Sequence, residues 1–363
     1  MRSNSPTGGS GARSGAGVAA DDPYAAAVHH YASARRSDLV KTLWERPVLV
    51  RLVGRALRHL RGEPGNSGAA LHALDVGAGA GEGFDLIAAA ALAVGHPSTF
   101  RYTALDRSDV MLRLAVTRLE KRAELIKPVV GDMADHRYTD DPAQLYLSSG
   151  APYSELTVAQ LTTAVRRICA AISCSRQSAA LILDVYGRYC PAWLPVSAPR
   201  WLYSMNFFYD TEWPPTREMG FYTPGQLDCI LAAALTEELR GRLTEVTFVD
   251  RSVFAGRHTT TCAYNPQLPR IRTIVNAVLA GDTAAVPALR VPSEAVLETP
   301  AFRSLDEQAA QTLSARIDSW NELVRCGPTG SLTTRLHALN DSIGAAAIGG
   351  GHYLTMLALF AAG

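Results

Sequence analysis

The stretch that decides the fold is Leu74-Asp75-Val76-Gly77-Ala78-Gly79-Ala80-Gly81-Glu82-Gly83. It follows a run that is typical of a buried strand and leads into a run that is typical of a helix. Glycines at such a junction let the chain turn tightly and let the backbone approach a ligand, while the first turn of the helix offers free N–H groups. We therefore predict that Gly77, Gly79 and Gly81 bind a ligand. Alone, the motif fits a dinucleotide equally well.

Carboxylates at three strand ends narrow the choice of ligand. Asp75 lies just before the glycines, where an acid would repel a pyrophosphate but can accept a hydrogen bond from an ammonium group. Asp106 ends the next predicted strand, where a carboxylate can hold both hydroxyls of a ribose, so it suits either cofactor. Asp132 ends the third strand and can accept the exocyclic amine of adenine, while Met133 packs against the ring. The set favours an adenosyl compound that carries an ammonium group.

With these motifs in this order, the chain resembles the class I S-adenosylmethionine (SAM)-dependent methyltransferase superfamily. The resemblance covers roughly residues 70 to 265 and rests on DVGAGAG (75–81), ALDRS (104–108) and GDM (131–133). It implies that SAM is the cofactor and lies across the carboxyl ends of the strands, with Asp106 at the ribose and Asp132 with Met133 at the adenine. The alternative is a Rossmann-like domain that binds NAD or no cofactor.

Alternation of short apolar runs with helix-like stretches predicts an α/β fold, in three layers, with a Rossmann-like, mostly parallel sheet of seven strands. The first five strands are expected at His72–Val76, Tyr102–Leu105, Lys127–Val130, Gln144–Leu147 and Ala180–Val185. Helices are expected between them, around Phe84–Val94, Val110–Leu125 and Val158–Ile172. Leu243–Val249 and His258–Tyr264 flank a turn and are predicted to close the sheet as an antiparallel hairpin.

Composition divides the chain into four parts. Residues 1–22 are rich in Gly, Ser and Ala and are expected to be a disordered tail. Residues 23–66 are predicted to form an N-terminal helical lid, and 67–265 the SAM-binding catalytic domain, with an aromatic insertion at 186–222. Residues 266–363 are expected to be a helical cap or dimerisation region without strands. Within it, Ile343–Ala362 is interrupted by glycines and His352, so a buried helix or subunit contact is expected rather than a membrane span.

The segment after the fourth strand is a candidate for the reaction centre. Many amino-group methyltransferases of this superfamily carry an Asn or Asp, two prolines and an aromatic residue there, whereas this chain keeps only Pro152 and Tyr153. The polar acceptor of that template is missing. We predict that Tyr153 contacts the substrate and that Glu155 is a general base or substrate anchor. The alternative for Glu155 is a first-turn acid of the helix that starts near Thr157.

The insertion after the fifth strand is unusually aromatic and is predicted to roof the active site. The alternative is a packed satellite core. Tyr186 and His258 are candidate catalytic residues, and a lone histidine at a strand start can also be structural. The remaining substrate-binding candidates are Asn206, Tyr209, Trp213 and Arg257, the last as an anchor for a substrate carboxylate.

Charge and cysteine content restrict the partners. The net charge of the 363 residues is +1, so no basic field is present to attract nucleic acid or an anionic membrane. A small-molecule substrate is the expected partner, with a homodimer as a further possibility. The six cysteines lack the spacing of a zinc or redox motif. No metal site is therefore predicted, and reduced thiols in the cytoplasm are expected.

Three functions remain open. The first is a methyltransferase that acts on a small molecule, in specialised metabolism. The second uses SAM itself as the substrate, its amine displacing methylthioadenosine to form azetidine-2-carboxylate, because SAM cyclases of that kind resemble methyltransferases. The third is a SAM-binding protein without catalytic activity.

Overall fold

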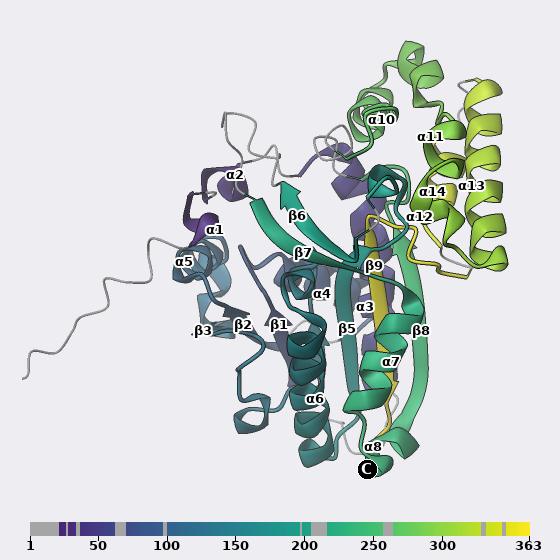
Figure 1. The fold of residues 1–363 in the computed structure, drawn as a ribbon. Coiled ribbons are helices and arrows are strands. Elements are labelled where there is room, and N and C mark those ends of the chain that lie inside the picture. The colour runs from purple at the N-terminus through teal and green to yellow at the C-terminus, as the bar shows by residue number, and fades with distance from the viewer. Residues whose placement is uncertain are drawn as a thin grey trace, which may run out of the picture.

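The computed structural model describes residues 22–26, 28–33, 37–61, 70–96, 100–196, 198–204, 216–256, 264–327, 332–342 and 346–363. They form an α/β fold in which helices cover both faces of a mostly parallel sheet (Figure 1). None of the helices in these ranges combines the length and apolar character that a membrane span needs.

The first five strands are parallel and lie in the order β3-β2-β1-β4-β5. Their bounds are Leu71–Val76 (β1), Phe100–Asp106 (β2), Ile126–Val130 (β3), Leu145–Leu147 (β4) and Ala179–Gly187 (β5). Every residue of β1 and β5 is buried. Strands covered on both faces read as continuous apolar runs, which is why the sequence located these elements closely.

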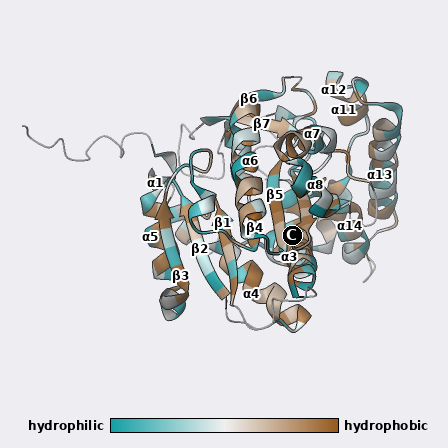
Figure 2. Ribbon diagram, turned by 90° about the horizontal axis from the view of Figure 1, so that it is seen from below, coloured by the Kyte–Doolittle hydropathy of each residue, from teal (hydrophilic) through white to brown (hydrophobic). Residues whose placement is uncertain are grey.

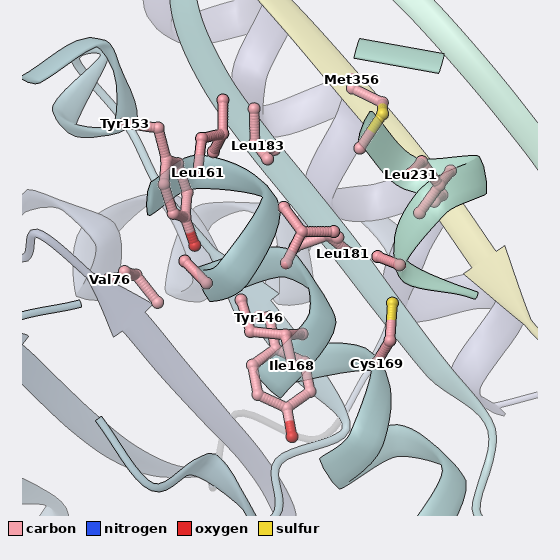
Figure 3. Packing of buried hydrophobic residues seen from close by; sticks show 14 of the residues in the cluster. Val76, Tyr146, Tyr153, Leu161, Ile168, Cys169, Leu181, Leu183, Leu231 and Met356 are labelled. Carbon is pink, nitrogen blue, oxygen red and sulfur yellow. The ribbon is translucent and has the colours of Figure 1, made fainter. Parts of the chain in front are cut away.

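Two layers of helices hold the sheet. The helices α3 (Arg46–Arg61) and α4 (Glu82–Val94) lie on one face, and α6 (Val158–Ser175) and α7 (Pro224–Ala234) on the other (Figure 1). Leu161 and Ile168 of α6 pack on Leu181 and Leu183 of β5 (Figure 3). Figure 2 shows the hydrophobic stretches of the central strands between these helices. The helix α5 (Asp109–Arg118) follows β2, and α8 (Glu237–Arg242) precedes the next long strand.

The far edge of the sheet corrects the predicted hairpin. The strand β8 (Leu243–Arg251) exists, but its antiparallel partner is β9 (Tyr353–Phe360), which also pairs antiparallel with β5. The yellow β9 lies between β5 and β8 in Figure 1. Tyr264, at the end of the predicted second strand, is helical, and residues 257–263 lie outside the described residues.

The expectation that no strand follows residue 266, and that Ile343–Ala362 is a helix or a subunit contact, is therefore wrong. All eight residues of β9 are buried, so its sequence YLTMLALF has no alternation. A short, continuous apolar run does not distinguish a buried helix from a buried strand.

A short hairpin extends the sheet beyond the end of β5. It consists of β6 (Arg200–Ser204) and β7 (Thr216–Tyr222), and β7 pairs with β5 through Tyr186 and Gly187. With this hairpin the sheet has nine strands among the described residues. The hairpin belongs to the aromatic insertion and brings it to the carboxyl end of β5.

Helices outside the sheet come from both termini. At the N-terminus, α1 (Pro23–Ala26), α2 (Val28–Ala32) and a π-helix (Val40–Glu45) precede α3. The C-terminal helices are α10 (Ile271–Leu279), a 3₁₀-helix (Thr283–Leu289), α11 (Glu294–Leu297), α12 (Pro300–Arg303), α13 (Glu307–Arg325) and α14 (Leu332–Asn340). They share a core around the buried Trp320, to which Val40 and Trp44 of the π-helix contribute.

Candidate active site

One cavity of about 200 Å³ lies at the carboxyl ends of the parallel strands and brings together seven of the ten predicted site residues that the structure describes. Those that line it are Gly77, Gly79, Asp106, Asp132, Met133, Glu155 and Tyr186. They come from the ends of β1, β2, β3 and β5 and from the segment after β4. Parallel strands bring their carboxyl ends to one edge, so residues far apart in sequence meet there.

The glycine turn needs glycine for two physical reasons. Gly77, Gly79 and Gly81 all have positive φ (71°, 51° and 75°), which residues with a Cβ rarely adopt. A Cβ on Gly77 would also collide with Pro152 in the segment after β4. Gly77 and Gly79 line the cavity, whereas Gly81 caps the amino end of α4 and is not among the lining residues.

Asp106 is positioned by backbone hydrogen bonds. Its Oδ2 accepts from the N–H of Gly79 (2.8 Å) and its Oδ1 from the N–H of Ser108 (2.9 Å). Burial raises the pKa of Asp106, and these hydrogen bonds oppose the rise. The carboxylate is thus fixed at the cavity wall, where its remaining lone pairs can accept two ribose hydroxyls.

Asp132 and Met133 form the next part of the wall. Asp132 Oδ1 accepts from the N–H of Ala134 (2.8 Å), and the carbonyl of Met133 accepts from the Tyr138 hydroxyl (2.9 Å). Both residues are therefore held by local contacts, with an acceptor and an apolar side chain at the cavity. This pairing fits an adenine amine and ring.

Asp75 lies beneath the glycine turn rather than on the cavity wall. It is 1% exposed, and its Oδ2 accepts from the Tyr102 hydroxyl (2.5 Å). Its Oδ1 has no hydrogen-bond partner among the described residues. A Cβ on Gly83 would collide with this carboxylate, so α4 begins directly against it. Burial raises the pKa of Asp75 to about 7.

The raised pKa of Asp75 predicts that Asp75→Asn stabilises the fold at alkaline pH. In the unfolded chain the pKa of an aspartate is about 3.9, so the folded protein binds the Asp75 proton more tightly than the unfolded chain does. The unfolding free energy of the wild type therefore falls as pH rises from about 4 to about 7. Asparagine still accepts from Tyr102 and carries no charge. We expect its advantage in unfolding free energy to be about 2–4 kcal/mol at pH 8 and small below pH 4. Urea unfolding at several pH values measures this difference, and an equal loss of stability at all of them would contradict it.

Residues that the sequence did not single out close the cavity. Tyr24 and Tyr31, from α1 and α2, line it, as does Arg107. The Tyr24 hydroxyl donates to Glu155 Oε1, and Arg107 pairs with Glu155 Oε2 (2.8 Å). Tyr24 and Glu155 are 131 positions apart, so no local signal could have linked them. Arg107 directly follows the predicted site residue Asp106, and this adjacency in sequence could have pointed to Arg107 as a cavity residue.

Glu155 belongs to a 3₁₀-helix (Pro152–Glu155) and not to the first turn of α6. The helix α6 begins at Val158 with Thr157 as its N-cap, in a capping box completed by Gln160. The alternative interpretation of Glu155 as a first-turn acid of that helix is therefore wrong. Its carboxylate instead lies at the cavity between a phenol and a guanidinium.

The aromatic insertion is mainly a packed cluster with one face at the cavity. Tyr186 lines the cavity and stacks on Tyr203 (centroids 4.9 Å apart) and Phe221 (5.6 Å). Trp193, Tyr203 and Phe221 are buried against one another, as the packed-core alternative expected. Met219 of β7 joins Tyr186 at the wall.

Tyr153 lies away from the cavity. Its ring is fully buried in the core between the sheet and α6, and its hydroxyl has no partner among the described residues (Figure 3). The structure therefore does not place Tyr153 where the predicted substrate contact needs it. The remaining candidates lie outside the described residues: Asn206, Tyr209, Trp213, Arg257 and His258.

The residues at the cavity fit SAM. Three features of the cavity match adenosine: the glycine turn has no room for a Cβ, the carboxylate of Asp106 is fixed at the end of β2, and Asp132 lies beside the apolar Met133 after β3. The acids at the wall (Glu82, Asp106, Asp132 and Glu155) suit a ligand that carries a sulfonium and an ammonium group.

Part of the chain is similar to a known protein family. Residues 73–173 match the family described as a methyltransferase domain. A search of curated protein sequences gives no match. Similar solved structures include an S-adenosylmethionine-dependent methyltransferase from Clostridium acetobutylicum, with 11% identity, a TM-score of 0.41, and coverage of 64% of this chain and 92% of that one.

Two further structures are similar to this chain. The CcbJ methyltransferase from Streptomyces caelestis is 14% identical, with a TM-score of 0.38 and coverage of 54% of this chain and 85% of that one. The [4+2]-cyclase SpnF is 13% identical, with a TM-score of 0.38 and coverage of 86% and 82%. The match to the methyltransferase domain covers residues 73–173, a segment that contains the glycine turn, Asp106 and Asp132.

Proposed function

We propose that this protein transfers the methyl group of SAM to a small molecule in specialised metabolism. The observation that carries the proposal is one cavity in which the adenosyl-binding set (Gly77, Gly79, Asp106, Asp132 and Met133) faces Glu155 and Tyr186. Its volume, about 200 Å³, is below the roughly 300–1,000 Å³ of common small-molecule pockets.

The residues of the cavity can align reactants and exclude water. When bound, SAM supplies an electrophilic methyl group on a sulfonium, and transfer needs a nucleophile in line with the methyl–sulfur bond. Asp106 orients the ribose, and the Tyr186 ring faces the reacting centre and excludes water. Glu155, held by Tyr24 and Arg107, can take a proton from the acceptor or fix its position.

The small volume favours one alternative reaction. In a SAM cyclase, the ligand's own amine attacks its γ-carbon, the carbon–sulfur bond breaks, methylthioadenosine leaves and the nitrogen loses a proton to give azetidine-2-carboxylate. No second substrate has to fit. A cavity of about 200 Å³ is compatible with a single reactant.

Product analysis separates the possibilities. Purified protein is incubated with SAM alone and then with SAM and pools of small molecules, and products are identified by mass spectrometry. S-adenosylhomocysteine that forms only with an added acceptor supports methyl transfer, whereas methylthioadenosine from SAM alone supports cyclisation. SAM that is bound but unchanged in every pool would overturn both reactions and leave a binding protein.

Tyr186→Phe is expected to lower turnover about 10-fold or more while SAM affinity stays within about twofold. The substitution removes the hydroxyl of this cavity-lining residue but keeps the ring that stacks on Tyr203 and Phe221. The matched control is Tyr203→Phe, a neighbouring buried tyrosine that is not among the cavity-lining residues. Steady-state kinetics with calorimetry distinguishes the two effects. Equal activity of the variant and wild type would remove Tyr186 from the reaction.

A further inference from the structure

The first described residues of the chain form one wall of the cavity. Residues 22–26 and 28–33, called the N-terminal strap below, contain α1 and α2. Tyr24 and Tyr31 of the strap line the same cavity as Asp106 and Asp132. Both helices contact α5, which follows β2, and they lie beside it in Figure 1. The strap therefore covers the site that we assign to the adenosyl group.

Two polar contacts anchor the strap, one on each side of the cavity. On the side of β2, Ser108 Oγ donates to Asp22 Oδ2 (2.5 Å), and Asp22 Oδ1 accepts from the N–H of Tyr24 (2.9 Å). On the side of β4, the Tyr24 hydroxyl donates to Glu155 Oε1, while Arg107 pairs with Oε2 (2.8 Å). The strap thus bridges the segment after β2 and the segment after β4.

The contact at Ser108 lies next to the predicted ribose site. The N–H of Ser108 donates to Asp106 Oδ1 (2.9 Å), and its hydroxyl donates to Asp22. Its Oγ also accepts from the N–H of Met111 (3.3 Å), as the N-cap of α5. One serine therefore connects the strap to the carboxylate that we assign to the ribose.

The contact at Glu155 needs the proton of Tyr24. Burial, followed by the neighbouring Glu155 carboxylate, raises the pKa of Tyr24 well above its ordinary value. The phenol therefore keeps its proton and remains a donor throughout the neutral pH range. Its ring also lies near that of Tyr31, with centroids 6.1 Å apart.

The strap is attached by polar contacts rather than by a core. Among the described residues, the hydrophobic cores include no side chain of the strap, and the first N-terminal residue to join one is Val40. The helices α1 and α2 have four and five residues, too few for a helix to be stable alone. A segment with few buried apolar contacts opens locally at a small cost in free energy. The strap can therefore detach while α3 and the sheet stay folded.

We propose that the strap is a gate that closes over bound SAM and detaches from Ser108 and Glu155 to let SAM enter and the product leave. The inference rests on the proposed use of SAM, and it narrows the lid expected at residues 23–66 to the strap. When the gate is closed, Tyr24 and Tyr31 exclude water from the cavity. A gate slows entry and release alike, whereas a simple ligand contact affects release and affinity together.

Binding rates compared with affinity test the gate. S-adenosylhomocysteine is passed over the immobilised full chain, and surface plasmon resonance gives the association rate, the dissociation rate and the Kd. In the double variant Asp22→Ala/Tyr24→Phe, which removes both anchors, we expect both rates to rise about 10-fold or more and the Kd to stay within about threefold. The matched control is Asp306→Ala, which removes an aspartate that accepts from the N–H of Ala309 (2.8 Å) outside the cavity. It should change neither rate.

The outcomes separate this inference from the proposed function. Unchanged rates in the double variant, or a faster release matched by an equal loss of affinity, would overturn the gate and leave SAM use intact. A wild-type protein that binds neither S-adenosylhomocysteine nor SAM would overturn the proposed function itself.

Hydrogen exchange provides a second readout that does not depend on the variants. In the wild type, S-adenosylhomocysteine should slow the exchange of the strap amides, because a closed gate protects them. Exchange in the strap that is equal with and without the ligand would contradict closure. Thermal unfolding of the double variant should match that of the wild type, since the strap adds no side chain to the described cores.

Discussion

Asp184→Asn is expected to destabilise the protein by about 3–5 kcal/mol, because it leaves a buried arginine without its counter-charge. Asp184 and Arg251 are 0% and 2% exposed, and Arg251 Nη2 lies 2.8 Å and 2.7 Å from the two carboxylate oxygens. Burial would lower the pKa of Arg251, but the Asp184 carboxylate raises it above its ordinary value. The substitution removes that carboxylate, but an arginine side chain has an ordinary pKa above about 12, so the guanidinium stays charged and cannot escape the loss by releasing its proton.

An exposed ion pair on β8, the strand that carries Arg251, provides the control. Glu245 of β8 pairs with Arg55 (2.7 Å), with side chains 27% and 46% exposed. Water screens this pair, so Glu245→Gln should cost no more than about 1 kcal/mol. Urea unfolding of both variants measures the difference. Equal effects of the two substitutions would show that the buried pair contributes no more to stability than the exposed one.

The Asp184 cluster also connects the C-terminus to the active site. Thr355 of β9 donates to Asp184 Oδ1 (2.6 Å), and the N–H of Gly150, which lines the cavity, donates to Oδ2 (2.9 Å). One carboxylate thus joins β5, β8 and β9 to the segment after β4. We expect Asp184→Asn to loosen that segment as well as the sheet.

The sequence predicted the elements whose signals are local. The strands β1 to β5 are apolar runs bounded by turns, and the glycine motif marks the first crossover. Asp106 and Asp132 were located because strand ends converge in any parallel sheet. Those inferences needed only neighbouring residues and a general rule of topology.

Other features depend on contacts that no local pattern encodes. Burial on both faces removes the alternation from β9, and residues 252–352 separate it from its partner β8. Tyr153, in the segment after β4, and Tyr186, near the end of β5, are both buried tyrosines, yet one packs in the core and the other lines the cavity. The Lys41–Glu82 ion pair, which joins the π-helix to the first residue of α4, links residues 41 positions apart.

Asp106→Ala is expected to weaken SAM binding by about 100-fold or more. The substitution removes an ionised acceptor that can hold two ribose hydroxyls, and each hydrogen bond to a charged group contributes about 1.5–3 kcal/mol. It also releases the N–H of Gly79, so the glycine turn loses part of its support. Burial raises the pKa of Asp106, so at neutral pH the ionised carboxylate lowers the unfolding free energy of the protein without SAM. Its removal should therefore leave the protein folded.

Calorimetric titration with SAM measures this effect directly. The control is Asp141→Asn, which changes another carboxylate that contacts β2 and β3, through Arg101 (2.7 Å) and Lys127 (3.0 Å). Asp141 is not among the cavity-lining residues, so its substitution should leave SAM affinity within about twofold. Unchanged affinity in Asp106→Ala would show that the ribose lies elsewhere.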